Sequence, residues 1–157
     1  MLLFHITDVS PPTFVVTCPA SPLQVYAERG LFSAQVSWSE PVATDNSGVP
    51  PTVTSNHQPP QRFSQGTHVV MYTAEDQSAN KASCSFTIEV MVINCTSLIN
   101  PGGPLLMSSC GIHFGAKCNF SCTIGYRLNG SSTVTCVAPG NGPPGSWDSP
   151  LPSCQGR

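Results

Sequence analysis

Cysteines offer more chemistry than any other residue type in this 157-residue chain. Two lie far apart in the first ninety residues, and six crowd into the last 63. Thiolates bind metals or act as nucleophiles, whereas paired cysteines form disulfides. An even number on a chain with few charges favours a disulfide framework, which persists only in oxidising compartments. We therefore expect a secreted, extracellular protein. The eight are Cys18, Cys84, Cys95, Cys110, Cys118, Cys122, Cys136 and Cys154.

Zinc is the first alternative to disulfides. Cys110, His113, Cys118 and Cys122 form a C-x2-H-x4-C-x3-C pattern, which has the residue types of a zinc site. Using these three cysteines for zinc would leave an odd set of three others near the C-terminus. We therefore favour disulfides and expect neither a metal nor a cofactor.

Calcium is the second alternative, since two turns hold oxygen ligands. Asp45 and Asn46 lie in one turn, and Asp76 and Asn80 lie in the other. Neither turn has the ligand density of a strong calcium site. Asp and Asn in turns usually cap their own backbone, so we expect capped turns without a metal.

The remaining candidates for catalysis are weak. The histidines (His5, His57, His68 and His113) are scattered, and no G-x-S-x-G motif is present. A Cys–His nucleophile needs a free thiol, and the even cysteine count leaves none. The sequence therefore predicts a protein that is not an enzyme and has no catalytic residues.

Composition excludes two classes of partner. Charged residues make up 9% of the chain, against about 25% in an average globular protein. The six basic residues are scattered, so the clustered basic patch of a nucleic-acid-binding protein is missing. No apolar run approaches the roughly 18 residues of a membrane span, so we expect no membrane insertion. The apolar start is too short for a secretory signal, and we interpret residues 1–7 as a leader or the end of a preceding module.

The first ninety residues show strand periodicity. In Ser83–Val90, apolar residues alternate with polar ones, which is typical of a half-buried strand. Similar alternation occurs at 70–74 and 34–38, and Phe14–Cys18 opens the series. Turn-rich segments separate these runs, and no stretch has sustained helical periodicity. The pattern predicts an all-β fold, an immunoglobulin-like β-sandwich.

Residues 8–92 resemble the hyalin repeat (HYR). The resemblance rests on Cys18-Pro19, Val36-Ser37-Trp38, the run from Ala43 to Gly48, the run from Val70 to Ala74, and Cys84-Ser85-Phe86. It implies a Cys18–Cys84 disulfide. Ala79 departs from the family, which usually has glycine there; if the position requires a positive φ, alanine costs about 1 kcal/mol.

Residues 93–155 resemble a sushi (complement control protein) module, a small disulfide-stapled β-module. The resemblance rests on Cys95, the run Cys122–Tyr126, Thr135-Cys136, Trp147 and Pro152-Ser153-Cys154. Spacing alone leaves 15 connectivities open for six cysteines. The resemblance implies Cys95–Cys136 and Cys122–Cys154, with a further short bridge Cys110–Cys118 as in six-cysteine sushi variants. Ala138–Gly145 is an insert relative to the family.

Three sequons mark candidate N-glycosylation sites at Asn94, Asn119 and Asn129. Asn94 is the weakest of them because its middle residue is Cys95.

Both families, by resemblance, mediate protein–protein contact in secreted mosaic chains. We expect a non-catalytic extracellular interaction module of the cell-adhesion or matrix type, cut from a larger protein. Its partners would be an extracellular or cell-surface protein and the flanking modules of the parent chain. The first segments to test are Ser47–Pro60, Cys110–Cys118 and Ala138–Gly145. The alternatives are a passive spacer between binding domains and complement-regulator-like binding.

Overall fold

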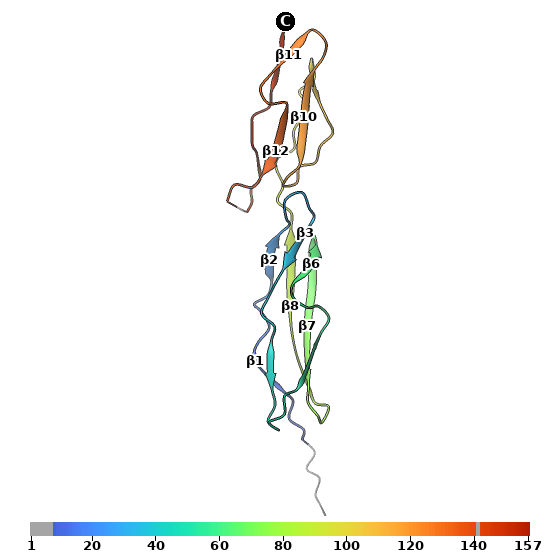
Figure 1. The fold of residues 1–157 in the computed structure, drawn as a ribbon, viewed down its shortest axis with the longest axis vertical. Helices are drawn as coiled ribbons and strands as arrows, with labels where there is room; N and C mark the ends of the chain where they lie inside the picture. The colour runs from blue at the N-terminus through green and yellow to red at the C-terminus, as the bar shows by residue number, and fades with distance from the viewer. Residues whose placement is uncertain (1–7, 141) are drawn as a thin grey trace, which may run out of the picture. The chain divides into compact units, whose positions relative to one another are not determined.

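All regular structure in the described part of the chain is β-strand. The computed structural model describes residues 8–140 and 142–157, and the proposed leader at 1–7, with His5, lies outside the described residues. The all-β prediction is confirmed (Figure 1). Over the described ranges, no helical segment has the length and hydropathy needed to span a bilayer.

The chain divides into two compact units. The first contains the described residues up to Val25 together with Gln35–Val90, and the second contains Tyr26–Ala34 and Met91–Arg157. Strands β1 to β8 belong mainly to the first unit. Their bounds are β1 Thr13–Val16, β2 Leu23–Tyr26, β3 Ser33–Val36, β4 Val42–Thr44, β5 Thr52–Ser55, β6 Gln61–Ser64, β7 Gly66–Glu75 and β8 Lys81–Met91.

Three sheets arrange these strands. The largest has the order β2-β8-β7-β5, and the other two pair β1 with β4 and β3 with β6. The centre is the antiparallel β7–β8 hairpin, whose register runs from Gly66↔Val90 to Glu75↔Lys81. Phe86, Ile88 and Val90 are buried on β8, as their alternation predicted. The same holds for Val70 and Tyr72 on β7.

Aromatic packing joins the sheets of the first unit. Trp38 was predicted within a strand, but it lies two residues after the end of β3. Its ring contacts Phe63 and Phe86, with centroid distances of 6.1 and 5.6 Å. Its Nε1 donates a hydrogen bond of 2.8 Å to the Tyr72 hydroxyl, so the indole is packed and satisfied.

The second unit carries the remaining strands. They are β9 Leu105–Met107, β10 Lys117–Cys122, β11 Tyr126–Asn129, β12 Thr133–Val137, β13 Ser146–Trp147 and β14 Ser153–Gly156. One sheet has the order β13-β12-β10-β9, and a second pairs β11 with β14. β10 pairs with β12 through its first half and with β9 through its second half.

Cysteines form much of the core of the second unit. Cys118, Val134 and Cys136 are fully buried, and Leu105 and Phe120 lie within a few per cent of full burial. The half-buried Trp147 ring packs against this core, and its Nε1 donates to the Thr96 carbonyl at 2.9 Å. A unit this small has little apolar surface to bury, so disulfides replace part of the usual core.

Segment Tyr26–Ala34 belongs to the second unit by its contacts. The Gly30 amide donates to the Phe114 carbonyl at 2.8 Å, and the Phe32 ring lies 4.7 Å from the His113 ring. Gly115 has a φ of +88°, and a Cβ there would lie 2.7 Å from the Gly30 nitrogen. Glycine is therefore required at position 115 both by conformation and by space.

Candidate interaction surfaces

Four disulfides contain all eight cysteines. The pairs are Cys18–Cys84, Cys95–Cys136, Cys110–Cys118 and Cys122–Cys154, with Cα–Cα distances between 5.2 and 5.9 Å. No cysteine is free. Thiolate is the form that binds zinc or attacks a substrate, so these pairs leave no cysteine for either role.

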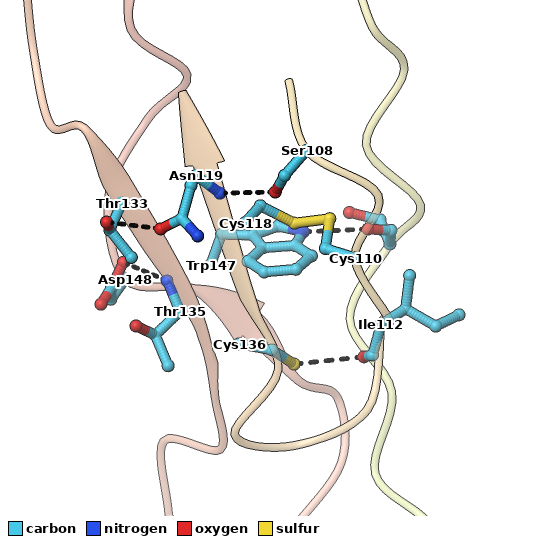
Figure 2. Close-up of a disulfide and its surroundings, with 11 residues drawn as sticks. Ser108, Cys110, Ile112, Cys118, Asn119, Thr133, Thr135, Cys136, Trp147 and Asp148 are labelled. Atoms are coloured by element: carbon cyan, nitrogen blue, oxygen red, sulfur yellow. Dashed lines mark hydrogen bonds between the residues drawn. A yellow bond between two sulfur atoms is a disulfide. The ribbon is translucent and has the colours of Figure 1, made fainter. Parts of the chain in front are cut away.

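The Cys110–Cys118 bridge closes a short loop that leads into β10 (Figure 2). Cys118 is buried on β10, whereas Cys110 is half-buried and Ile112 on the loop is exposed. The Cys136 Sγ atom lies 3.3 Å from the Ile112 carbonyl oxygen. The loop is therefore tied to the core at Cys118 and at the Ile112 carbonyl. Residues 113–115 are half-buried, and the Phe114 carbonyl and the His113 ring contact Gly30 and Phe32. The exposed residues of the loop are Gly111, Ile112 and Lys117.

Asn119 is anchored beside this bridge. Its backbone amide donates to the Ser108 hydroxyl at 3.0 Å, and its Oδ1 accepts from the Thr133 hydroxyl at 2.9 Å (Figure 2). A shallow surface hollow lies along β9 and β10 at this point, and it is lined by Leu106, Met107, Ser108, Asn119, Phe120 and Ser121. The hollow exposes apolar side chains beside hydrogen-bonding groups.

Segment Ser47–Pro60 borders two hollows of the first unit. Val49 and Pro50 line one of them, and Val53, Thr54 and Ser55 line the other. The segment contains β5, a strand at the edge of the four-stranded sheet, paired on one side with β7. An edge strand presents unpaired backbone groups on its other side, which can pair with an added strand.

The Ala138–Gly145 insert is described except for residue 141. Its Pro139 and Pro143 are exposed. At its end, a Cβ on Gly145 would lie 2.8 Å from the Asn94 carbonyl oxygen and 3.1 Å from the Cys95 Sγ atom. This close approach fixes the end of the insert against the first cysteine of the second unit.

The three sequon asparagines lie at exposed positions. Asn119 is on β10, Asn129 ends β11, and Asn94 forms an isolated antiparallel bridge with His113. Asn129 stands at a strand end followed by a glycine with a φ of +112°. A turn at the chain surface is the setting in which a glycan is sterically easiest to place.

Two histidines that are separated in the sequence lie near one aromatic ring. The rings of His57 and His68 lie 5.2 and 5.0 Å from the ring of Phe63. His57 Nδ1 is 3.1 Å from Gln61 Oε1, and His68 Nε2 is 2.7 Å from the Ser64 carbonyl oxygen. Both imidazoles are thus held by packing and local hydrogen bonds. The sequence alone gave no indication of this proximity.

The two turns considered for calcium come together in the structure, and a third acidic residue joins them. One carboxylate oxygen each from Asp8, Asp45 and Asp76 lies within 4.8 Å of the other two. Asn80 Nδ2 connects the parts by donating to the Asp8 carbonyl at 3.0 Å and to Asp76 Oδ2 at 2.8 Å. Asp8 was not among the candidate ligands named from the sequence.

The Asp45 carboxylate caps its own turn through one of its two oxygens. Its Oδ2 accepts hydrogen bonds from the Ser47 hydroxyl and from the Ser47 backbone amide. These bonds lower the pKa of the Asp45 carboxyl below its usual value of 3.8, since they favour the charged form. The carboxylate is therefore ionised at neutral pH.

Two known domain families match the sequence of this chain. The HYR domain family model matches residues 7–90, more than half of the chain, and the Sushi repeat (SCR repeat) model matches residues 102–154. The chain belongs to the HYR domain family. Its second part is a Sushi repeat.

Several curated proteins are similar in sequence to most of this chain. Sushi repeat-containing protein SRPX2 from Bos taurus is 35% identical over 132 residues, covering 82% of this chain and 28% of the relative. Sushi-repeat-containing protein SRPX from Mus musculus is 34% identical over 150 residues, covering 94% of this chain and 31% of the relative. The human protein SRPX2 is 36% identical over 132 residues, covering 82% of this chain and 28% of the relative. The chain thus spans less than a third of the length of these relatives.

HYR domains and Sushi repeats are extracellular protein-interaction modules. In this HYR–Sushi chain, Ser47–Pro60 contains an exposed edge strand, Ala138–Gly145 lies between β12 and β13, and Cys110–Cys118 is closed by a disulfide. The arrangement suits recognition of another macromolecule by surface loops and edges.

Proposed function

We propose that this HYR–Sushi chain is a non-catalytic recognition module of a larger secreted adhesion or matrix protein, and that its partner is an extracellular or cell-surface protein. The observation that supports this most strongly is segment Ser47–Pro60. It combines an edge strand with two bordering hollows and exposed valines. A scaffold held by disulfides lowers the ordering cost of binding through such a segment.

The proposal includes the boundaries of the modules and their bridges. We place the HYR domain at 8–92 and the Sushi module at 93–155, and we assign the disulfides Cys18–Cys84, Cys95–Cys136, Cys110–Cys118 and Cys122–Cys154. Mass spectrometry of peptides from the unreduced protein tests the assignment. Four cross-linked peptide pairs with these partners are expected, and any other pairing would refute it.

Binding can be tested with charge substitutions on exposed side chains. Val49 and Val53 are 40% and 37% exposed and line the two hollows. We expect V49K/V53K to raise the half-saturating concentration on cultured cells or cell-derived matrix at least tenfold. Burying an unpaired lysine at an interface is costly, which is the reason for the expected loss.

The matched control places the same two charges elsewhere on the same unit. Val15 and Val69 are 60% and 52% exposed and line neither hollow. V15K/V69K should bind within twofold of the native chain, and circular dichroism should show both variants folded. Equal binding by both variants would remove the segment from the binding site. An absence of saturable binding by the native chain would favour the passive spacer.

The same binding assay tests whether the Sushi module contacts the partner. Ile112 is exposed on the loop closed by Cys110–Cys118, and Ile124 is fully exposed outside that loop. I112K should weaken binding if the loop contacts the partner, with I124K as its control. Replacement of Pro139 and Pro143 by alanine tests the Ala138–Gly145 insert in the same assay. If none of these changes affects binding, the Sushi module takes no part in recognition.

A further inference from the structure

Three carboxylates gather in the HYR domain where its beginning meets two turns. Asp8 precedes β1, Asp45 follows β4, and Asp76 follows β7. Their oxygens lie within 4.8 Å of one another. The nearest basic residue in sequence, Lys81, is paired with Glu75 at 3.2 Å instead. Like charges this close repel one another unless a cation lies between them.

A second observation concerns one oxygen of Asp45. Its Oδ1 has less than 1 Å² of accessible surface and no hydrogen-bond partner in the described part of the chain. The other oxygen, Oδ2, accepts hydrogen bonds from Ser47, so the turn satisfies Oδ2 but supplies no donor to Oδ1. A buried carboxylate oxygen without a donor is rare, because its desolvation is costly. A bound cation is a partner that would satisfy this oxygen.

The geometry points to one Ca²⁺ ion bound by Asp8, Asp45 and Asp76, and we propose this site as a property of the HYR domain beyond its proposed binding function. Ca²⁺ takes six to eight oxygens at about 2.4 Å, so two of its ligands lie at most about 4.8 Å apart. Mg²⁺ at about 2.1 Å would require the oxygens to lie within about 4.2 Å and in near-octahedral positions. The three oxygens satisfy the pairwise limit for Ca²⁺, and the less strict coordination geometry of Ca²⁺ favours it over Mg²⁺ at this site.

Neighbouring groups can complete the coordination. Asn46 Nδ2 makes only a long contact of 3.4 Å with Asp8 Oδ1, and a half-turn of the amide brings its oxygen toward the site instead. Asn80 is held more firmly by its bonds to Asp8 and Asp76 and fixes the two segments beside each other. Water can fill the remaining positions, as in extracellular calcium modules with dissociation constants of about 10⁻⁴ to 10⁻³ M.

Titration calorimetry of the 157-residue chain with CaCl2 at constant ionic strength tests the site. We expect one ion per chain and a dissociation constant in the range of about 10⁻⁴ to 10⁻³ M. D45N and D8N should each weaken binding at least tenfold, because each removes a charged ligand. E40Q removes one charge from an exposed position outside the cluster and should bind within twofold of the native chain. Mg²⁺ should bind at least tenfold more weakly than Ca²⁺.

Thermal unfolding gives a second readout. Ca²⁺ should raise the unfolding temperature of the native chain and of E40Q, and should have little effect on D45N and D8N. If D45N does not fold, D8N decides the result, because Asp8 precedes the first strand. No heat and no thermal shift up to about 10 mM CaCl2 would overturn the site, as would equal binding by D8N and E40Q. Either failure leaves the proposed partner binding untouched, since that is measured separately.

Discussion

Ala79 occupies a backbone conformation that favours glycine. Its φ is 66°, in the turn between β7 and β8, where its amide donates to the Asp76 carbonyl at 3.2 Å. The sequence pointed to this position, because HYR domains usually have glycine there. The position does require a positive φ. The Cβ atom of Ala79 is therefore held in a conformation that is sterically unfavourable for every residue except glycine.

Substitution of Ala79 by glycine should therefore stabilise the chain. We expect A79G to raise the free energy of unfolding by about 1 kcal/mol, measured by urea denaturation. Ala82 on β8 is the matched control, because glycine inside a strand costs about 0.5–1 kcal/mol. A82G should therefore lower the free energy of unfolding. A decrease with A79G would contradict the strain at position 79.

The Asp45–Ser47 pair makes stability depend on pH. The pKa of Asp45 is lower in the folded chain than its usual value of 3.8, first through the Ser47 hydroxyl and then through the Ser47 amide. The resulting stabilisation is present above pH 3.8 and is lost as the pH falls through the lower, folded-state pKa.

Removing the hydroxyl tests this pH dependence. S47A should raise the pKa of Asp45 toward 3.8, as observed by NMR titration of the carboxyl carbon in the absence of calcium. The backbone amide remains in place, so the recovery should be partial. S78A changes a serine whose amide binds Asp76 and should leave the Asp45 titration unchanged. An unchanged Asp45 pKa in S47A would show that the hydroxyl has no effect.

The place of Asp8 in the carboxylate cluster could not be predicted from its neighbours in the sequence. The sequence marks Asp45 and Asp76 as candidate ligands because each lies in a turn with an asparagine. Asp8 has no such neighbour, and its role depends on three segments meeting in space, 37 and 31 residues apart in sequence. Local patterns contain no information about such a meeting.

At the scale of elements, prediction succeeded where periodicity was long. The alternation on β8 identified its buried face, and β7 followed the same pattern. β5 was missed within Ser47–Pro60, because a four-residue strand flanked by Pro50-Pro51 and Pro59-Pro60 resembles a loop. Its pairing with β7 is a long-range contact, and such contacts leave no trace in a short run of residues.

The short bridge of the Sushi module should make a limited contribution to stability. C110A/C118A opens a loop of about nine residues and should lower the free energy of unfolding by about 2–3 kcal/mol while the module stays folded. C122A/C154A opens a loop of about 33 residues and should cost about 1 kcal/mol more by the same chain-entropy reasoning. Urea denaturation of both variants measures the difference. Complete unfolding of C110A/C118A would show that the short bridge is essential.

At the scale of the whole molecule, the chain combines two ways of stabilising a β-structure. The HYR domain buries an aromatic and aliphatic core around Trp38, Phe63 and Phe86, whereas the Sushi module builds its core partly from cystines. The cysteine distribution and the strand periodicity made both visible in the sequence. The exposed edges and hollows were not visible, because they depend on which strands end each sheet.

Competition on a cell or matrix surface tests whether these edges and hollows bind the partner. Labelled native chain is bound at its half-saturating concentration, and unlabelled competitors are then added. We expect full displacement by the native chain and by V15K/V69K, with at least tenfold more V49K/V53K needed for the same displacement. Binding that unlabelled native chain does not displace, or displacement by all three competitors at equal concentrations, would contradict this expectation.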